Sequence, residues 1–210
     1  MKTIVLASSN HGKINEFSQL VAEFGLHLVP QSVFNLSSVA ETGLSFVENA
    51  LLKARFAAQH TGLPALADDS GLEVVALQGA PGIYSARFAG EEATDAENNQ
   101  LLLEKLADIP ESQRTARYHC AIVLLRHATD PTPLICQGTW TGSITFMPRG
   151  TLGFGYDPYF YVPTYQCTAA ELPTEIKNRI SHRALAFQQF TLAWQQTLQN
   201  EPPFSLLNIR

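Results

Sequence analysis

Two adjacent carboxylates, Asp68 and Asp69, are the residues whose types and spacing most directly suggest chemistry. They stand in the stretch PALADDSGLEV, after a short apolar run and before a serine and a glycine. Neighbouring anions repel one another unless water or a cation separates them. The pair is therefore either a solvated turn or part of a magnesium site, because hard cations take oxygen ligands and the sequence offers no cluster of His and Cys.

The apolar run predicts a strand that ends near Asp68, and α/β proteins bind ligands at the carboxyl ends of strands. Adjacent residues of an extended chain point to opposite faces, so both aspartates can address one ion only if the backbone turns at Ser70 and Gly71. We expect such a turn. Glu41, in a polar loop upstream, is a third carboxylate, which taken alone is typical of a solvated residue.

The stretch SSNHGK, residues 8–13, lies where a predicted strand passes into a predicted helix. A helix N-terminus presents N–H groups and the positive end of its dipole to anions, which makes this turn a phosphate-site candidate. The stretch does not match the G-x-x-x-x-G-K-[ST] pattern. In the simpler interpretation, Asn10 caps the helix and Lys13 is solvated.

Lys53 lies in the apolar stripe of a predicted helix, in line with Phe46, Ala50 and Ala57. A charged amine at that position faces inward. Either its stem lies along the core while the amine reaches water, or the amine pairs with an internal anion.

Two motifs later in the sequence contain an aromatic ring or a group of cationic side chains. In GFGYDP, Phe154 stands between two glycines, which would leave one ring face open for stacking on a base; a core phenylalanine in a turn is the alternative. In KNRISHR, Ser181 is placed as the cap of the last helix, and His182 and Arg183 fall in its first turn. Cations there oppose the helix dipole at a cost of about 0.3 to 1 kcal/mol, which suggests that they are needed for another purpose.

The elements that must position these residues alternate between strands and helices. Strands are predicted over residues 3–7, 26–30 and up to Asp68, and the two long β-rich runs between residues 117 and 146 predict a hairpin. Helices are predicted from residue 14 to an end at Gly25, over 46–59, over 94–107 and over 181–199. Ser45 and Glu48 have the S-x-x-E form of a capping box at the start of the second of these. This order indicates an α/β protein with a mixed sheet.

Composition restricts the class of function. A formal net charge of -5 argues against a nucleic-acid polymer as the main ligand, whereas a small polyanion needs only a few cations. The 3 cysteines are far apart and fit a reducing compartment. The apolar N-terminal run is too short for a signal peptide or a membrane span, so we expect a cytoplasmic protein that is not bound to a membrane.

Six motifs in order resemble the noncanonical purine nucleoside triphosphate pyrophosphatases, the inosine triphosphate pyrophosphatase family. The resemblance covers residues 3–190 and rests on SSNHGK, ETGLSFVENALLKA, ADDSGLEV, GAPGIYSARFAG, PRGTLGFGYDP and KNRISHRALA. It implies one two-lobed domain over residues 1–210, with an elongated mixed sheet, an active-site cleft between the lobes, and a homodimer. It also implies Mg²⁺-dependent hydrolysis of dITP, ITP or XTP to the monophosphate and pyrophosphate.

The resemblance also implies roles for individual residues. Asp69 would be the general base and a metal ligand, with Glu41 and Asp68 supporting the ion. The substrate-binding residues would be Ser8, Ser9, Asn10, His11, Gly12, Lys13, Lys53, Ser70, Phe154, Gly155, Tyr156, Asp157, Lys177, His182 and Arg183.

Two features depart from the family pattern. The stretch CTAAEL, residues 167–172, differs at Cys167 and Ala169, which concerns local packing, and the tail, residues 200–210, is unassigned. Two alternatives stay open at this point: a Maf-like nucleotide pyrophosphatase, which would not be expected to carry GFGYDP followed by SHR, and a nucleotide-binding sensor without turnover.

Overall fold

The structure, a computed structural model, describes residues 2–21 and 26–200. Its N-terminal part is a parallel unit in which β1 (Lys2–Leu6) pairs with β2 (Leu26–Pro30) and β3 (Ala65–Val74). The connections are α1 (His11–Val21) and α2 (Phe46–Thr61). The predicted end of the first helix at Gly25 lies outside the described residues.

The rest of the sheet is antiparallel. It is formed by β4 (Thr115–Leu125), β5 (Leu134–Ile144), β6 (Phe160–Val162) and β7 (Cys167–Thr168), and the full strand order is β2-β1-β3-β4-β5-β6-β7. The prediction of an α/β fold with a mixed sheet is confirmed, and so is the long hairpin. The remaining helices are α3 (Asp95–Lys105), α4 (Thr174–Ile180) and α5 (His182–Asn200). The sequence did not predict α4 or the two shortest strands.

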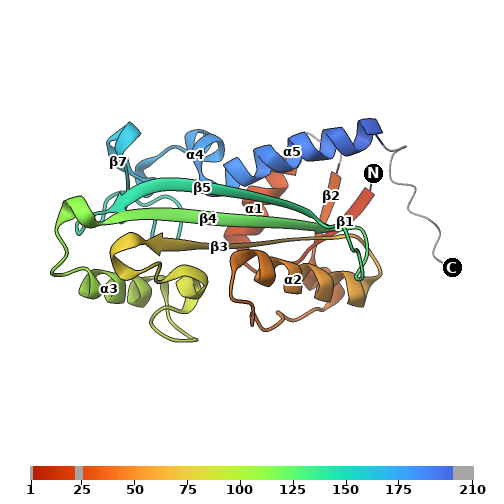
Figure 1. Cartoon of the computed structure of the whole chain (residues 1–210), viewed down its shortest axis with the longest axis horizontal. Coiled ribbons are helices and arrows are strands. Elements are labelled where there is room, and N and C mark those ends of the chain that lie inside the picture. Colours follow the sequence, from red (N-terminus) through yellow and green to blue (C-terminus); the bar gives the residue numbers. More distant parts are fainter. Residues whose placement is uncertain (1, 22–25, 201–210) are drawn as a thin grey trace.

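The long strands β3, β4 and β5 run along the molecule and connect two groups of helices (Figure 1). At one end, α2 packs on one face of the sheet and α1 with α5 on the other; α3 and α4 lie toward the opposite end. Buried alanines at 50, 54 and 57 bring α2 close to the sheet. On the other face, aromatic side chains of α1 and α5 fill the core, among them Phe17, Phe187 and Phe190.

The turn predicted at Ser70 and Gly71 is wrong, because β3 continues to Val74. Its ladder with β4 is unbroken, with Asp68 opposite Ile122 and Asp69 opposite Ala121. Gly71 has another purpose: a Cβ there would lie 2.3 Å from the carbonyl oxygen of Gly82. The glycine therefore permits close packing of the following loop on the strand.

The predicted S-x-x-E cap of α2 is confirmed in part. Ser45 Oγ accepts from the N–H of Glu48 at 3.3 Å, but the Glu48 carboxylate accepts from the N–H of Leu44, at 2.8 Å, where a capping box would use that of Ser45. Ser181 caps α5 as predicted, since its Oγ accepts from the N–H of Ala184 at 3.2 Å.

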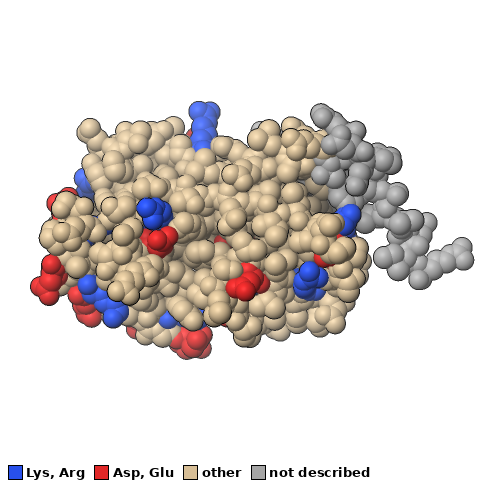
Figure 2. All heavy atoms as spheres, viewed as in Figure 1, with Lys and Arg blue, Asp and Glu red and all other residues tan. Residues whose placement is uncertain are grey.

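Charged side chains on the face drawn in Figure 2 are scattered and do not gather into a basic patch. No helix in the described ranges combines the length and the apolar character that crossing a bilayer requires.

Candidate active site

A cavity of about 320 Å³ brings together residues from both ends of the sheet. The residues predicted for the site that line it are Ser8, Ser9, Asn10, Lys13, Glu41, Lys53, Asp68, Asp69, Ser70, Phe154, Gly155, Tyr156, Asp157, Lys177, His182 and Arg183. Gly12 lies next to it, and the side chain of His11 is outside the described part of the chain.

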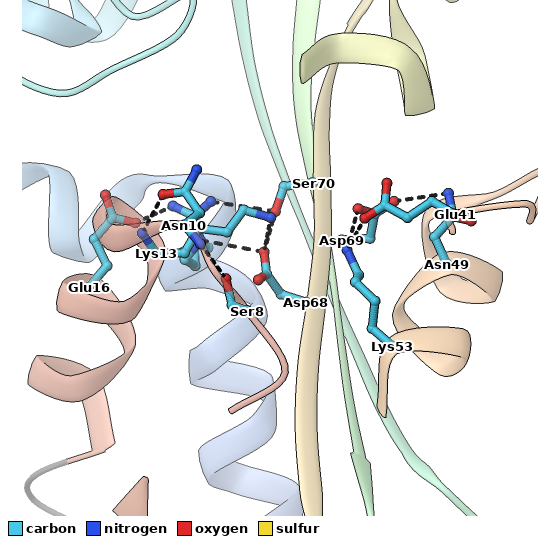
Figure 3. Close-up of polar contacts among 11 residues, drawn as sticks. Ser8, Asn10, Lys13, Glu16, Glu41, Asn49, Lys53, Asp68, Asp69 and Ser70 are labelled. Atoms are coloured by element: carbon cyan, nitrogen blue, oxygen red, sulfur yellow. Dashed lines mark hydrogen bonds and ion pairs between the residues drawn. The ribbon is translucent and has the colours of Figure 1, made fainter. Parts of the chain in front are cut away.

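The two aspartates enter this region on opposite faces of β3 (Figure 3). Asp68 points toward α1 and α5, where its Oδ2 lies 2.9 Å from Lys13 Nζ and 3.8 Å from Arg183 Nε. Ser70 Oγ donates to the same oxygen at 2.6 Å. Arg183 is held in turn by an ion pair with Glu16 of α1. Asp68 therefore faces two cations, one of which is shared with Glu16.

Asp69 points toward α2, where it shares one ammonium with a second carboxylate. Lys53 Nζ lies 2.8 Å from Asp69 Oδ1 and 2.7 Å from Glu41 Oε1, and Arg87 Nη1 lies 3.4 Å from the other oxygen of Glu41. Asn49 Nδ2 donates to Asp69 Oδ2 at 3.3 Å. The prediction that Lys53 faces inward is confirmed, and its partner is the internal anion.

These surroundings shift the pKa values of the two aspartates in opposite directions. Burial would raise the pKa of Asp68, but Lys13 and Arg183 outweigh it and hold that pKa well below its usual range. Burial also raises the pKa of Asp69, and the negative charge of Glu41 adds to it, so that Lys53 does not bring the pKa back to its usual value. Asp69 is therefore the more basic carboxylate.

The donor set suits a hard divalent cation on the Asp69 face only. Glu41 and Asp69 converge on the same ammonium, so two carboxylates offer oxygen ligands on one face of β3, with Arg87 on the other oxygen of Glu41. Asp68 lies across the strand from them, because successive side chains of a continuous strand alternate. No three acidic, His or Cys side chains come together as metal ligands within the described residues.

The turn before α1 serves as both a cap and a cavity wall. Asn10 Oδ1 accepts from the N–H of Lys13 at 3.1 Å, as a helix cap does, and Ser8 Oγ accepts from the N–H of Asn10 at 3.2 Å. Lys13 is not solvated as the simpler interpretation had it, because it pairs with Asp68. A Cβ at Gly12 would lie 3.0 Å from the ring of Phe154, so a glycine lets that ring approach.

Phe154 marks the other end of the cavity. Its ring is 38% exposed, with Lys177 Nζ 5.6 Å and the Arg183 guanidinium 5.9 Å from the ring centroid. Asp157 organises this end: its Oδ2 accepts from Lys177 Nζ at 2.6 Å and from the N–H of Phe154 at 3.0 Å. Gly153, at φ +79°, is required here because a Cβ would lie 2.1 Å from Asp157 Oδ2.

His182 is buried and stacks on Tyr118, with ring centroids 4.7 Å apart. Burial and the adjacent Arg183 hold the pKa of His182 well below its usual value, so the ring is neutral at pH 7. Its Nδ1 has no hydrogen-bond partner in the described part of the chain, and neither do Asp68 Oδ1 and Arg183 Nε. Since buried polar atoms are normally paired, these three cavity-lining residues are suited to a polar ligand.

Sequence reasoning missed several residues at the site, namely Glu16, Asn49, Asp95, Asn98 and Tyr118. A helical-spacing test could have found Asn49, which precedes Lys53 by one turn. The others are brought in by contacts between segments far apart in the sequence.

Comparison with known proteins agrees with this geometry. A sequence model of the Ham1 family matches residues 4–193. The chain belongs to the Ham1 family. It is 57% identical over 193 residues to the dITP/XTP pyrophosphatase of Photobacterium profundum, covering 92% of this chain and 98% of that protein. It is also 57% identical over 188 residues to the dITP/XTP pyrophosphatase of Escherichia coli K12, covering 90% and 95%.

Solved structures of the Ham1 family share the fold. A HAM1 protein from Coxiella burnetii is 51% identical with a TM-score of 0.87, and the match covers 93% of this chain and all of that one (100%). A nucleoside-triphosphatase, or dITP/XTP pyrophosphatase, from Mycobacterium abscessus is 43% identical with a TM-score of 0.74, covering 90% and 98%.

Proposed function

We propose that this chain hydrolyses noncanonical purine nucleoside triphosphates, namely dITP, ITP and XTP, to the monophosphate and pyrophosphate, and so cleanses the nucleotide pool. The observation that carries the proposal is that one cavity joins a carboxylate of raised pKa, Asp69, to a ring platform at Phe154. The relatives named dITP/XTP pyrophosphatase support the same activity.

The triphosphate lies, in this proposal, between the turn of residues 8–13 and Lys53. Backbone N–H groups of the turn and the α1 dipole attract the anion, with Ser8, Ser9, Asn10 and Gly12 around it. Lys13 and Lys53 supply positive charge from opposite faces of β3, and Ser70 reaches the substrate from the strand between them.

Asp69 acts as the general base. It accepts a proton from the attacking water while Lys53 holds its Oδ1 in place and Asn49 its Oδ2. A pKa raised by burial suits this role, because a stronger base takes the proton more readily. Glu41 and Asp69 would hold Mg²⁺, which supplies charge neutralisation at the phosphates. Asp68 is not proposed as a ligand, since it faces Lys13.

The base lies on Phe154, with Lys177, Asp157, His182 and Arg183 around it. The neutral His182 can accept or donate one hydrogen bond, whereas Lys177 and Arg183 offer donors only. This donor-rich edge favours a purine with a 6-oxo group over one with a 6-amino group. Tyr156 fixes the position of the loop that carries Phe154, because its hydroxyl donates to the carbonyl of Ser85 at 2.7 Å.

A pyrophosphate-release assay over a panel of nucleoside triphosphates tests the proposal. We expect ITP, dITP and XTP to be cleaved with pyrophosphate as the first product, EDTA to stop the reaction and Mg²⁺ to restore it. Orthophosphate as the first product would mean attack at the terminal phosphorus and would overturn the proposal. Binding without turnover would identify a sensor.

The homodimer, the cytoplasmic location and the unity of residues 1–210 as one domain remain predictions. Sedimentation velocity of the purified chain measures the first of these directly.

A further inference from the structure

Helix α3 approaches the loop that carries Phe154 from the other wall of the cavity. Its first residue, Asp95, lies 60 positions before Gly155 in the sequence, yet Asp95 Oδ2 accepts from the N–H of Gly155 at 2.7 Å. One turn later, Asn99 Nδ2 donates to the carbonyl of the same Gly155 at 2.9 Å. Both polar groups of a single residue are thus held by one helix.

Gly155 itself has no side chain to hold it, although Asp157 accepts from the N–H of the preceding Phe154. Gly155 has φ +62° and nothing within 4 Å of where a Cβ would be. It lies between Phe154 and Tyr156, so a change in its dihedrals would move the ring on one side or the other. A glycine adopts many conformations at little cost, which makes an external restraint effective here.

The orientation of Asn99 follows from its partners. Its Nδ2 also donates to the carbonyl of Asp95 at 2.7 Å, and both acceptors are carbonyl oxygens, so the NH₂ group must face them. This leaves the buried Asn99 Oδ1 without a hydrogen-bond partner among the described residues. An unpaired buried acceptor destabilises a fold, so stability alone does not explain an asparagine at this position.

The same helix also fixes the neighbouring wall. Asn98 Oδ1 accepts from the N–H of Ala89 at 2.8 Å, and Asn98 Nδ2 donates to the carbonyl of Ala86 at 3.1 Å. Asp95 and Asn98 both line the cavity. One face of α3 therefore connects the Phe154 loop with the end of the 3₁₀ helix Gly82–Arg87 and the residues just after it.

We propose that Asp95 and Asn99 are positioning residues for base recognition: they clamp Gly155 so that Phe154 is pre-set to stack on the purine. The inference rests on the proposed function and adds to it residues that do not touch the phosphates. The phosphate end is built from α1, α2 and β3, so the clamp should affect binding of the base and leave binding of the phosphates unchanged.

The experiment compares Asp95→Ala with Asp95→Asn, which keeps an acceptor for the Gly155 N–H. Steady-state kinetics with ITP should show KM raised about tenfold in Asp95→Ala, as loss of a charge-assisted hydrogen bond would give, with kcat changed less than about twofold. Asp95→Asn should restore most of the affinity. The inhibition constant of inorganic tripolyphosphate, which has no base, should be the same in all three proteins.

Asn99→Leu separates positioning from stability, because it removes the unpaired acceptor together with the Gly155 bond. We expect its melting temperature to be equal to or above that of the wild type while its KM for ITP rises. Gln100→Ala is the matched control on the same helix, since Gln100 is exposed and bonds only to Glu104 among the contacts described.

The outcomes separate the two proposals. If the wild type releases no pyrophosphate from ITP, the proposed function fails. If the wild type is active but Asp95→Ala keeps its KM, or if tripolyphosphate binding weakens in parallel with ITP, the clamp is overturned.

Discussion

The two faces of β3 give identical side chains opposite properties. On one face, Asp68 is surrounded by Lys13 and Arg183 and its pKa lies well below its usual range. On the other, burial and Glu41 raise the pKa of Asp69. The two residues are adjacent in sequence, and the strand between them does nothing more than alternate its side chains.

The difference shows how one strand can give two adjacent carboxylates different chemical properties within one site. The Asp68 face binds its cations tightly and leaves the carboxylate weakly basic, which suits an anchor for Lys13 and Arg183. The Asp69 face places two carboxylates on one ammonium and raises the pKa of Asp69, which suits proton transfer. A site in which both aspartates held one ion would lose this separation.

The largest expected effect is that of Asp69→Asn on turnover. The amide keeps the shape but cannot accept the proton or the metal charge, so kcat should fall by about 10²- to 10⁴-fold. Pyrophosphate release measures it, and circular dichroism checks the fold. Glu73→Gln is the control on the same face of β3, because Glu73 pairs with His119 and Arg117 away from the cavity. If Asp69→Asn kept activity within a few-fold of the wild type, Asp69 would not be the general base.

The second effect concerns stability and has opposite expectations for the two aspartates. A carboxylate whose pKa is lowered by folding stabilises the fold above its unfolded pKa, and that contribution is lost as the pH falls. Asp68→Asn leaves Lys13 and the buried Arg183 without their common anion, which should cost about 3 kcal/mol and roughly 6 to 12 °C in melting temperature at pH 7. The pKa of Asp69 is raised by folding, so the ionised carboxylate destabilises the folded chain at pH 7. Asp69→Asn should therefore not lower the melting temperature. Equal losses in both variants would contradict the comparison.

A third prediction concerns Arg183, which links the Asp68 face to the base platform. Guanidinium donates only, so it matches a 6-oxo purine and is mismatched with a 6-amino group. Arg183→Ala should shrink the ratio of kcat/KM for ITP over ATP by roughly tenfold, which corresponds to 1.4 kcal/mol. Steady-state kinetics with both substrates measures it. An unchanged ratio would assign base recognition to Lys177 or to backbone groups around Phe154.

The smallest effect is a shift of the pH profile. Asp69 works as a base only when ionised, and its pKa is raised, so kcat/KM should fall as the pH is lowered through that raised value. Lys53 lowers the pKa of Asp69, so in Lys53→Met the acid limb should move to higher pH. Arg55→Met is the control, because Arg55 is on α2 but bonds to the carbonyls of Ala128 and Asp130. If kcat/KM fell but the acid limb did not shift, Lys53 would have no effect on the titration of Asp69.

Much of the site was predictable because it rests on local patterns. The helical period placed Lys53 on the buried face of α2, and the strand-to-helix transition located the turn at residues 8–13, which lines the cavity. The hairpin of β4 and β5 followed from two long β-rich runs. These inferences need only the geometry of one element and its neighbours along the chain.

The prediction of a turn at Ser70 and Gly71 failed for a long-range reason. A glycine after a serine is typical of a turn, but here it is required by the carbonyl of Gly82, which packs against the strand. The short elements α4, β6 and β7 were missed for a related reason, since so few residues carry no period of their own.

The sequence by itself determined which side chains are available and that they alternate along strands or recur along helices, because those periods are properties of the backbone. Only the tertiary structure decided which of the two carboxylates has the raised pKa. A pKa depends on burial and on the distances to other charges, and Lys13, Arg183, Lys53 and Glu41 reach the two aspartates from three helices and a loop that meet only in the folded chain. The clamp of α3 on Gly155 is of the same kind, because no local pattern connects residues 60 positions apart.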